Sequence, residues 1–428
     1  MDTLAVPRAL PEGATADRRA GGGRSAALAR DVGGGFGDSA LLIPLAIALI
    51  TVNHLNATAV FAGAGVLYVA TGVWHRLPIP VQPLKAVSAI AIGVGLGASG
   101  IAAAGLLIGA LFLALSLTGI ADRLRPVFTP AVVRGIQLAV GILLVRTAWE
   151  LMTRHHQFVF SLAGGLEGPL LGVAIALLVA AAAWRRLPGI PLLVLGGGLL
   201  LGVVAGHHRV SGLALGPQPL SLALPSGAVF LTALWTLAVP QLALSLGNSL
   251  MATSSASVSY FGDRGRRVTP GRLALSMGLA NLVVSPLGGM PMCHGAGGLT
   301  AHVRMGARSG VATATYGVVL ITLAVVVGAG APTVLAFLPA AVLAGLLLYV
   351  GVMHATLIGE LRSHVDVAVA LVIGAVSAIT GNITIGVGVG LVCVAALALR
   401  SRVSHWATAT ASPVHAEPPV HAVESPRP

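Results

Sequence analysis

Two short stretches place polar residues and helix-breaking residues inside otherwise apolar sequence. Residues 80–85 read PVQPLK, and residues 291–296 read PMCHGA. Proline and glycine interrupt a helix, and the small residues that follow each stretch can restart one. A helix that begins inside an apolar layer leaves its first backbone N–H groups unpaired, and such groups bind anions. The two stretches therefore predict the two sides of one anion site.

The candidate binding side chains come from these two stretches. They are Gln82, Pro83, Lys85, Cys293, His294 and Gly295. A lysine within an apolar segment costs about 2.5–3.5 kcal/mol on insertion scales, so a functional role is the default interpretation. Two helix starts of about +0.5 each and one ammonium group together supply about +2, which favours a dianion.

Asp38, near the start of the first apolar segment, is the candidate for ion coupling. An ionised carboxylate beside Lys85 would cancel the charge that the lysine offers to an anion, and protonation would restore that charge. A structural salt bridge between the two residues is the alternative interpretation. The coupling ion, a proton or sodium, stays open.

A third polar group lies in the apolar segment 229–252, which contains no carboxylate. Gln241, Ser245, Asn248 and Ser249 are spaced so that most of them share one face of a helix. Gln241 and Asn248 are the binding candidates on this face. Polar residues also hold helices together inside a membrane, which is the alternative role.

The neighbours Cys293 and His294 are the one pair that suggests a metal, and no second pair lies at zinc spacing. We therefore predict no metal site, no cofactor and no catalytic residue. A membrane-embedded enzyme that uses this pair is an alternative function.

The composition identifies the class of protein. Of the 428 residues, 56% are hydrophobic and only 9% are charged, whereas about a quarter of the residues of a soluble domain are charged. About fourteen apolar segments between residues 37 and 401 have lengths that suit membrane helices, with short ones at the third and tenth positions. The sequence predicts an all-α polytopic membrane protein whose main partner is the lipid bilayer.

The formal charge of +12 comes from short basic clusters between apolar segments. This distribution follows the positive-inside pattern and puts both termini in the cytoplasm. No aromatic or basic module for nucleic acid accompanies it, so we predict no nucleic-acid partner.

The chain divides into two related halves. Pro80 and Pro291 are followed, about fifty residues later in each half, by Pro130 and Pro339 within similar sequence. An odd number of spans in each half, about seven, would insert the halves with opposite topology, as in the inverted repeats of transporters. The predicted boundaries are a disordered tail 1–36, a first repeat 37–206, a linker 207–228, a second repeat 229–401 and a disordered tail 402–428.

At these residues the sequence resembles the molybdate transporter type 1 family, distant relatives of the sulfate permeases. The matching stretches are 78–86 (PIPVQPLKA), 240–249 (PQLALSLGNS), 290–299 (MPMCHGAGGL) and 304–308 (RMGAR). The family usually reads GDLGT at the first span, where residues 37–41 read GDSAL, and Leu84 replaces a common methionine.

The resemblance implies oxyanion uptake at the cytoplasmic membrane and the uracil-permease-type fold. Spans one to four and eight to eleven would form a core domain, and the remaining spans a gate domain. We expect a secondary active importer of molybdate or a similar tetrahedral oxyanion. A sulfate or nucleobase transporter of the same fold and an anion channel are alternatives, and a homodimer is left open.

Overall fold

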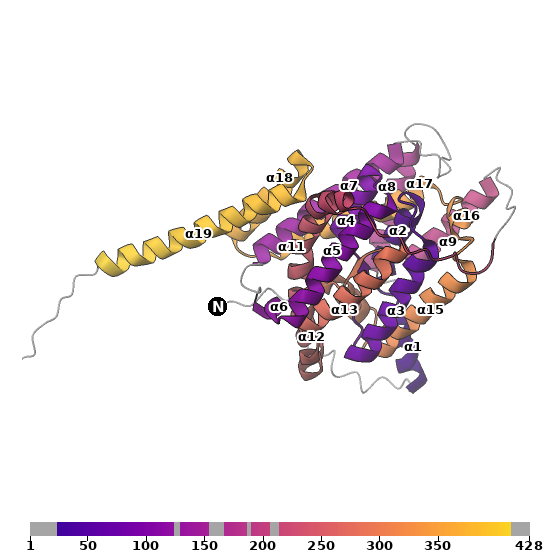
Figure 1. Cartoon of the computed structure of the whole chain (residues 1–428), viewed down its shortest axis with the longest axis horizontal. Helices are drawn as coiled ribbons and strands as arrows, with labels where there is room; N and C mark the ends of the chain where they lie inside the picture. The colour runs from indigo at the N-terminus through magenta and orange to yellow at the C-terminus, as the bar shows by residue number, and fades with distance from the viewer. Residues whose placement is uncertain (1–23, 124–128, 154–166, 186–189, 206–213, 412–428) are drawn as a thin grey trace, which may run out of the picture.

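The chain folds into a helical bundle from which the last helix projects (Figure 1). The computed structural model describes residues 24–123, 129–153, 167–185, 190–205 and 214–411. Within these ranges all regular structure is helical except for one pair of two-residue strands. Seven helical stretches are long and apolar enough to cross a membrane, and shorter apolar helices accompany them. The prediction of a mostly helical, multi-pass membrane protein is confirmed.

The described elements of the first half are mainly helices. They are α1 (Arg24–Gly34), α2 (Ser39–Thr51), α3 (Ala57–His75), β1 (Gln82–Pro83), α4 (Lys85–Val94), α5 (Ala98–Leu117), α6 (Ile120–Arg123), α7 (Pro130–Thr153), α8 (Glu167–Trp184) and α9 (Ile190–Ala205). With 10 residues, α4 is about 15 Å long, half the thickness of the hydrocarbon layer.

The second half has the same order of elements. They are α10 (Gly227–Ala233), η2 (Leu234–Ala238), α11 (Val239–Leu244), η3 (Ser245–Ala252), α12 (Thr253–Phe261), η4 (Gly262–Arg267), α13 (Pro270–Val284), η5 (Ser285–Leu287), β2 (Met292–Cys293), α14 (Ala296–Arg304), α15 (Gly310–Val327), α16 (Ala331–Leu335), α17 (Ala340–Thr356), η6 (Leu357–Glu360), α18 (His364–Thr380) and α19 (Ile383–Ala411). Like α4, the 9-residue α14 is too short to cross the bilayer.

The packing of the helices is reciprocal between the halves. If α3, α5, α7 and α8 correspond to α13, α15, α17 and α18, then the contact of α3 with α15 corresponds to that of α13 with α5. In the same way, the contact of α7 with α18 corresponds to that of α17 with α8. All four contacts are present. This reciprocity supports the inverted repeat, although the exact number of spans stays a prediction.

The contacts also group the helices into two sets. We call residues 39–117 and 227–327 the core set, which includes the α3–α15 and α5–α13 contacts. Residues 130–153, 167–184, 190–205 and 340–411 form the gate set, in which α7 packs against α17 and α18, and α18 against α19. Helices α4 and α7 make one of the contacts between the sets.

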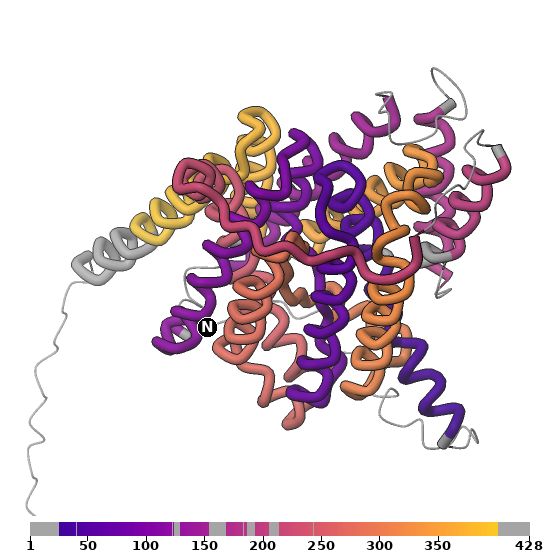
Figure 2. The backbone as a smooth tube through the Cα atoms, turned by 45° about the vertical axis from the view of Figure 1, so that its right-hand side comes forward, coloured from indigo at the N-terminus to yellow at the C-terminus, as the bar shows by residue number. Residues whose placement is uncertain are grey.

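The segment between the halves crosses the bundle as an extended chain (Figure 2). The Gly216 N–H donates to the Val326 carbonyl oxygen over 2.9 Å, and the Ala223 N–H donates to the Pro286 carbonyl oxygen over 2.9 Å. The Gln218 side chain accepts from the Ala57 N–H at 3.0 Å, at the start of α3. The described part of the linker, from residue 214, is therefore fixed to the ends of core helices.

Both terminal segments contain more structure than the sequence suggested. Residues 24–34 of the predicted disordered tail form α1, and Asp31 accepts hydrogen bonds from the Arg308 and Ser309 N–H groups at 2.6 and 3.0 Å. At the other end, α19 continues to Ala411, past the predicted boundary at 402. Residues 1–23 and 412–428 lie outside the described residues.

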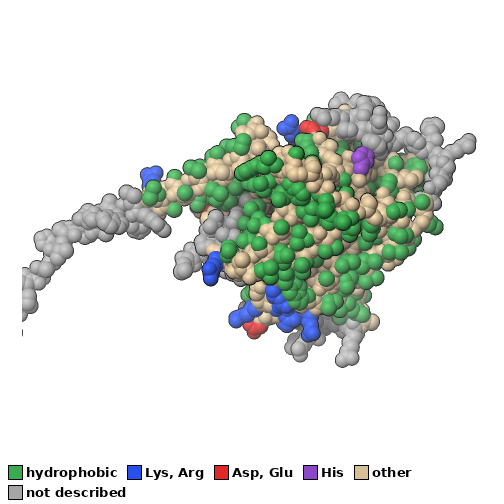
Figure 3. Space-filling view, viewed as in Figure 1, with side chains coloured by type: hydrophobic (Ala, Val, Ile, Leu, Met, Phe, Trp, Pro, Cys, Tyr) green, Lys and Arg blue, Asp and Glu red, His purple; other side chains and the backbone are tan. Residues whose placement is uncertain are grey.

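The outer surface is apolar over most of the view in Figure 3. Large exposed hydrophobic residues lie on helices of both sets, including Leu177 on α8, Val325 on α15 and Val392 on α19. Patches of this extent on a soluble protein would mark a binding surface, whereas here they suit the lipid-facing sides of membrane helices.

Candidate anion-binding site

The two predicted stretches meet in the middle of the bundle. Strands β1 and β2 pair antiparallel, with Gln82 opposite Cys293 and Pro83 opposite Met292. The Leu84 N–H also donates to the Pro291 carbonyl oxygen at 2.9 Å. Proline and glycine break the helix on each side, and the extended residues then satisfy their backbone groups by pairing with each other. Short helices α4 and α14 follow directly, so both begin at this pair.

Gln82 connects the two charged residues of the site. Its Nε2 donates to both carboxylate oxygens of Asp38, at 2.8 and 2.7 Å, and its Oε1 accepts from Lys85 Nζ at 2.5 Å. All three side chains are at most 5% exposed. Asp38 and Lys85 are thus not paired directly, as the structural alternative assumed. The amide of Gln82 lies between the two charges and connects them. In this conformation the Gln82 donors that we assigned to an anion are used by Asp38.

Gln241 on α11 occupies the N-terminus of α4. Its Oε1 accepts from the Ala86 N–H at 2.8 Å and from the Val87 N–H at 3.3 Å, and its Nε2 donates to Ser245 Oγ at 2.8 Å. The sequence predicted that these N–H groups were unpaired, which is wrong for α4, because a neutral side chain caps the helix. Gln241 therefore lies at the site, where it caps α4, a role that the sequence did not indicate.

The N-terminus of α14 is the more open of the two. Gly297 is exposed, and a Cβ atom built on it would meet nothing within 4 Å. Because α14 begins at Ala296, the N–H groups of its first turn have no carbonyl partner inside the helix. Backbone donors of such an open first turn can bind an anion, so this turn is the candidate position for one.

Gly295 and Gly298 allow the close approach that holds the two stretches together. A Cβ atom on Gly295 would lie 2.3 Å from Gln82 Oε1, and one on Gly298 would lie 2.4 Å from Gln82 Nε2 and 2.7 Å from Asp38 Oδ2. Real Cβ atoms are essentially never that close to other atoms. Glycine at these two positions is therefore required by packing against Gln82 and Asp38.

His294 and Cys293 are directed at protein partners. His294 Nδ1 donates to the Pro80 carbonyl oxygen at 2.8 Å, and Nε2 lies 2.8 Å from Ser276 Oγ. The Cys293 thiol contacts the Pro83 carbonyl oxygen at 3.6 Å. Both ring nitrogens of the fully buried His294 are thus used, and the residue positions the first stretch instead of offering a donor to an anion in this conformation.

Two regions of the eighth span are π-helical, η2 and η3, so the strict helical spacing assumed from the sequence does not apply there. Such widened turns are frequent at functional sites. η3 places Asn248, which is 4% exposed, near Gly295: a Cβ atom on Gly295 would lie 3.3 Å from Asn248 Nδ2. Asn248 thus reaches the second stretch, and its role in binding stays a prediction.

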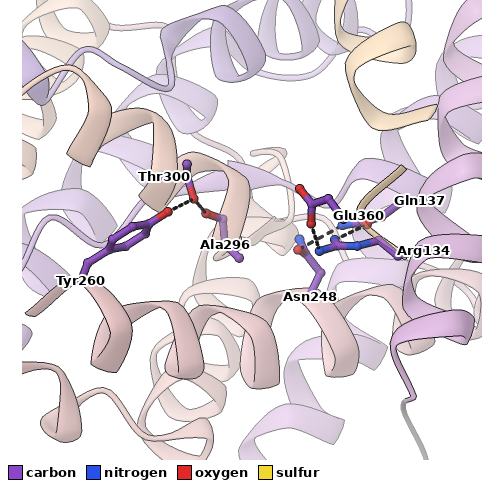
Figure 4. Close-up of polar contacts among 7 residues, drawn as sticks. All are labelled: Arg134, Gln137, Asn248, Tyr260, Ala296, Thr300 and Glu360. Carbon is purple, nitrogen blue, oxygen red and sulfur yellow. Dashed lines mark hydrogen bonds and ion pairs between the residues drawn. The ribbon is translucent and has the colours of Figure 1, made fainter. Parts of the chain in front are cut away.

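Asn248 also links the core set to the gate set (Figure 4). Its Oδ1 accepts from Gln137 Nε2 at 3.2 Å, and Gln137 Oε1 accepts from Arg134 at 2.7 Å. Arg134 also pairs with Glu360. Arg134, Gln137 and Glu360 were not among the predicted site residues. A polar face on α7, formed by Arg134 and Gln137 at helical spacing, was the signal available.

A second polar contact lies beside the first turn of α14 (Figure 4). Tyr260 OH on α12 and Thr300 Oγ1 on α14 are 3.0 Å apart, and Thr300 donates to the Ala296 carbonyl oxygen at 2.9 Å. Both side chains are partly buried. These hydroxyl groups fix α12 to the half-helix whose first turn is open.

The fold and the site together define a multi-pass membrane protein with a polar site where two broken helices begin. A sequence profile described as "Molybdate transporter of MFS superfamily" matches residues 30–144 and 233–353, together more than half of the chain. The chain belongs to this molybdate transporter family, which confirms the resemblance seen in the sequence.

Named relatives agree with this assignment. The chain is 29% identical over 416 residues to molybdate transporter 2 of Arabidopsis thaliana, which covers 87% of this chain and 88% of the relative. It is 28% identical over 476 residues to molybdate transporter 1 of Chlamydomonas reinhardtii, with 86% and 91% covered.

Solved structures show the fold. The transmembrane domain of the cyanobacterial bicarbonate transporter BicA superposes with a TM-score of 0.59 at 18% identity, covering 87% of this chain and 98% of that one. SLC26A9 superposes with a TM-score of 0.62 at 14% identity, covering 87% of this chain and 66% of that one. At these identities the likeness concerns the fold alone.

Proposed function

We propose that this protein is a secondary active transporter that imports molybdate, or a similar tetrahedral oxyanion, across the cytoplasmic membrane by alternating access. The observation that carries the proposal is the pairing of the two broken helices, which puts the open first turn of α14 beside Gln82 and Lys85. The relatives named as molybdate transporters support the substrate.

The net charge of the site depends on whether Asp38 is ionised, which links anion binding to the binding of a cation at Asp38. Asp38 and Lys85 together are neutral when both are ionised, and the start of α14 adds about +0.5. Protonation of Asp38 would leave the Lys85 charge uncompensated and raise the total to about +1.5. A dianion is therefore bound best when the charge of Asp38 is neutralised, and we propose that a proton neutralises it.

The division into core and gate sets supports alternating access. The candidate binding residues Gln82, Lys85, Gln241 and Gly295 all belong to the core set, whereas Arg134 and Gln137 belong to the gate set. We propose that the core set rocks against the gate set and carries the site from one side of the membrane to the other. Both termini face the cytoplasm in this proposal, and a homodimer is compatible with it.

Uptake into proteoliposomes tests the proposed function. The purified protein is expected to take up molybdate with saturation, with tungstate competing strongly and with sulfate and uracil competing weakly. Uptake against a molybdate gradient distinguishes a transporter from a channel. Stronger competition by sulfate or uracil would assign one of those substrates instead, and conversion of a compound in detergent would favour the membrane-embedded enzyme.

The role of Asp38 in coupling gives a separate prediction. An imposed gradient with the acidic side outside is expected to accelerate uptake by the wild type. Asp38→Asn should lose this acceleration while it retains exchange of molybdate at equal pH, because an asparagine cannot take up a proton. The measurement is the initial rate with and without the gradient. An unchanged response of Asp38→Asn to the gradient would show that Asp38 does not carry the proton.

A further inference from the structure

A chain of polar contacts leads from the candidate site to a partly exposed arginine on the gate set. Asn248, beside Gly295, binds Gln137, and Gln137 binds Arg134. The side chain of Arg134 is 15% exposed, and that of its ion-pair partner Glu360 is 37% exposed. The chain of contacts thus ends at a partly exposed ion pair.

The charge of this ion pair matters for a dianion. With Asp38 and Lys85 both ionised, the described groups of the candidate site supply only the partial charge at the start of α14. An arginine guanidinium has five N–H donors and suits tetrahedral oxyanions such as phosphate. Arg134 uses one terminal nitrogen for Gln137 and the other for Glu360, so the carboxylate occupies donors that an oxyanion would use.

We propose that Arg134 and Gln137 form a second oxyanion-binding position at the mouth of the candidate site, and that Glu360 is a built-in competitor for it. An oxyanion that moves between the first turn of α14 and the solvent would replace the Glu360 carboxylate on Arg134. This inference rests on the proposed function, because it assumes that the oxyanion binds at the start of α14.

The position in the fold supports a binding role. Arg134 lies one turn into α7, and Glu360 lies in η6 directly after α17, so the pair joins two helices of the gate set. The contact between Gln137 and Asn248 crosses from the gate set to the core set. A site on this boundary changes its surroundings when the two sets move, as a transient position for a transported ion must.

The proposal is tested by the direction in which two single substitutions change the affinity for molybdate. Molybdate binding to purified full-length protein in nanodiscs is measured by calorimetry. Glu360→Gln should tighten binding by about tenfold, because it removes one negative charge that competes near a dianion, and Arg134→Gln should weaken binding by about the same factor. If the ion pair is purely structural, both substitutions should lower thermal stability, and they should not change the affinity in opposite directions.

A second ion pair on the same helix provides the matched control. Arg146 and Glu150 on α7 form a salt bridge at 3.1 Å away from the site contacts. Arg146→Gln and Glu150→Gln should leave molybdate affinity unchanged. The double variant Arg134→Gln/Glu360→Gln leaves no unpaired charge, so its affinity can be measured if either single variant is unstable. It should bind molybdate more weakly than Glu360→Gln alone.

The outcomes separate this inference from the proposed function. Unchanged affinity in both Glu360→Gln and Arg134→Gln, or changes of the same sign, would overturn the second position while molybdate binding to the wild type persists. If the wild type shows no saturable molybdate binding, both the proposed function and this inference are contradicted.

Discussion

Gly298→Ala is expected to reduce molybdate uptake at low substrate by about tenfold or more. A methyl group on Gly298 would lie 2.4 Å from Gln82 Nε2, 2.7 Å from Asp38 Oδ2 and 2.8 Å from Pro80 Cβ. Each of these atoms is held in place, because Gln82 is bonded to both Asp38 and Lys85. Overpacking of this kind costs about 1–3 kcal/mol and would separate α14 from the first stretch.

Two other helical glycines provide the control for this substitution. Gly197 in α9 and Gly388 in α19 are exposed, and a Cβ atom built on either would meet nothing within 4 Å. Gly197→Ala and Gly388→Ala should therefore transport like the wild type. Initial rates at equal amounts of protein in the membrane are compared. Wild-type uptake by Gly298→Ala would show that the close contact of α14 with Gln82 is not needed for transport.

Lys85→Ala is expected to show the second large effect, a loss of uptake by about a hundredfold. The substitution leaves Gln82 Oε1 without its donor and the buried Asp38 charge uncompensated, and an uncompensated buried charge costs about 3–5 kcal/mol. It also removes a full positive charge that, among the described residues of the candidate site, only Lys85 supplies beside Gln82. Gln82→Ala should reduce uptake in the same direction, because it breaks the link between Lys85 and Asp38.

A charge-balanced variant separates the loss of binding from the loss of folding. Asp38→Asn/Lys85→Met removes both charges, so it should regain the thermal stability that Lys85→Ala loses, while uptake should stay as low as in Lys85→Ala. Arg185→Ala, after the end of α8, removes an exposed charge away from the site and should transport normally. Restored uptake in the double variant would show that Lys85 serves only to neutralise Asp38.

The sequence predicted the broken helices well because their cause is local. Proline at residues 80, 83 and 291 and the glycines after residue 294 break a helix in any context, so the starts of α4 and α14 could be placed from the chain alone. The length of the apolar segments likewise indicated membrane helices such as α3, Ala57–His75. That two stretches so far apart would pair was inferred from the repeat.

The partners of the site residues could not be predicted, because they depend on tertiary contacts. Gln241 capping α4 requires the eighth span to pass the start of the third, and His294 bonding to the Pro80 carbonyl oxygen requires the strand pair. The π-helical turns of η3 also shift the side chains from the faces that a period of 3.6 predicts. Only the set of polar residues was readable, and their assignment to substrate or to structure was not.

The Arg134 contacts illustrate the same limit. An arginine at the start of a membrane helix is usually an interfacial anchor, and nothing in the order of residues connects it to Glu360, which lies 226 positions later. Its relation to Asn248 appears only through Gln137. Residues that join the two sets of helices are thus the ones that sequence patterns locate least well.

The binding of tungstate to the protein, located by its strong scattering in an experimental density map, tests the central claim most directly. The account predicts one strong peak at the first turn of α14, within hydrogen-bonding distance of its backbone N–H groups and beside Lys85. Saturating tungstate without a peak between the two half-helices, or with its main peak on the lipid side of α14, would contradict the account.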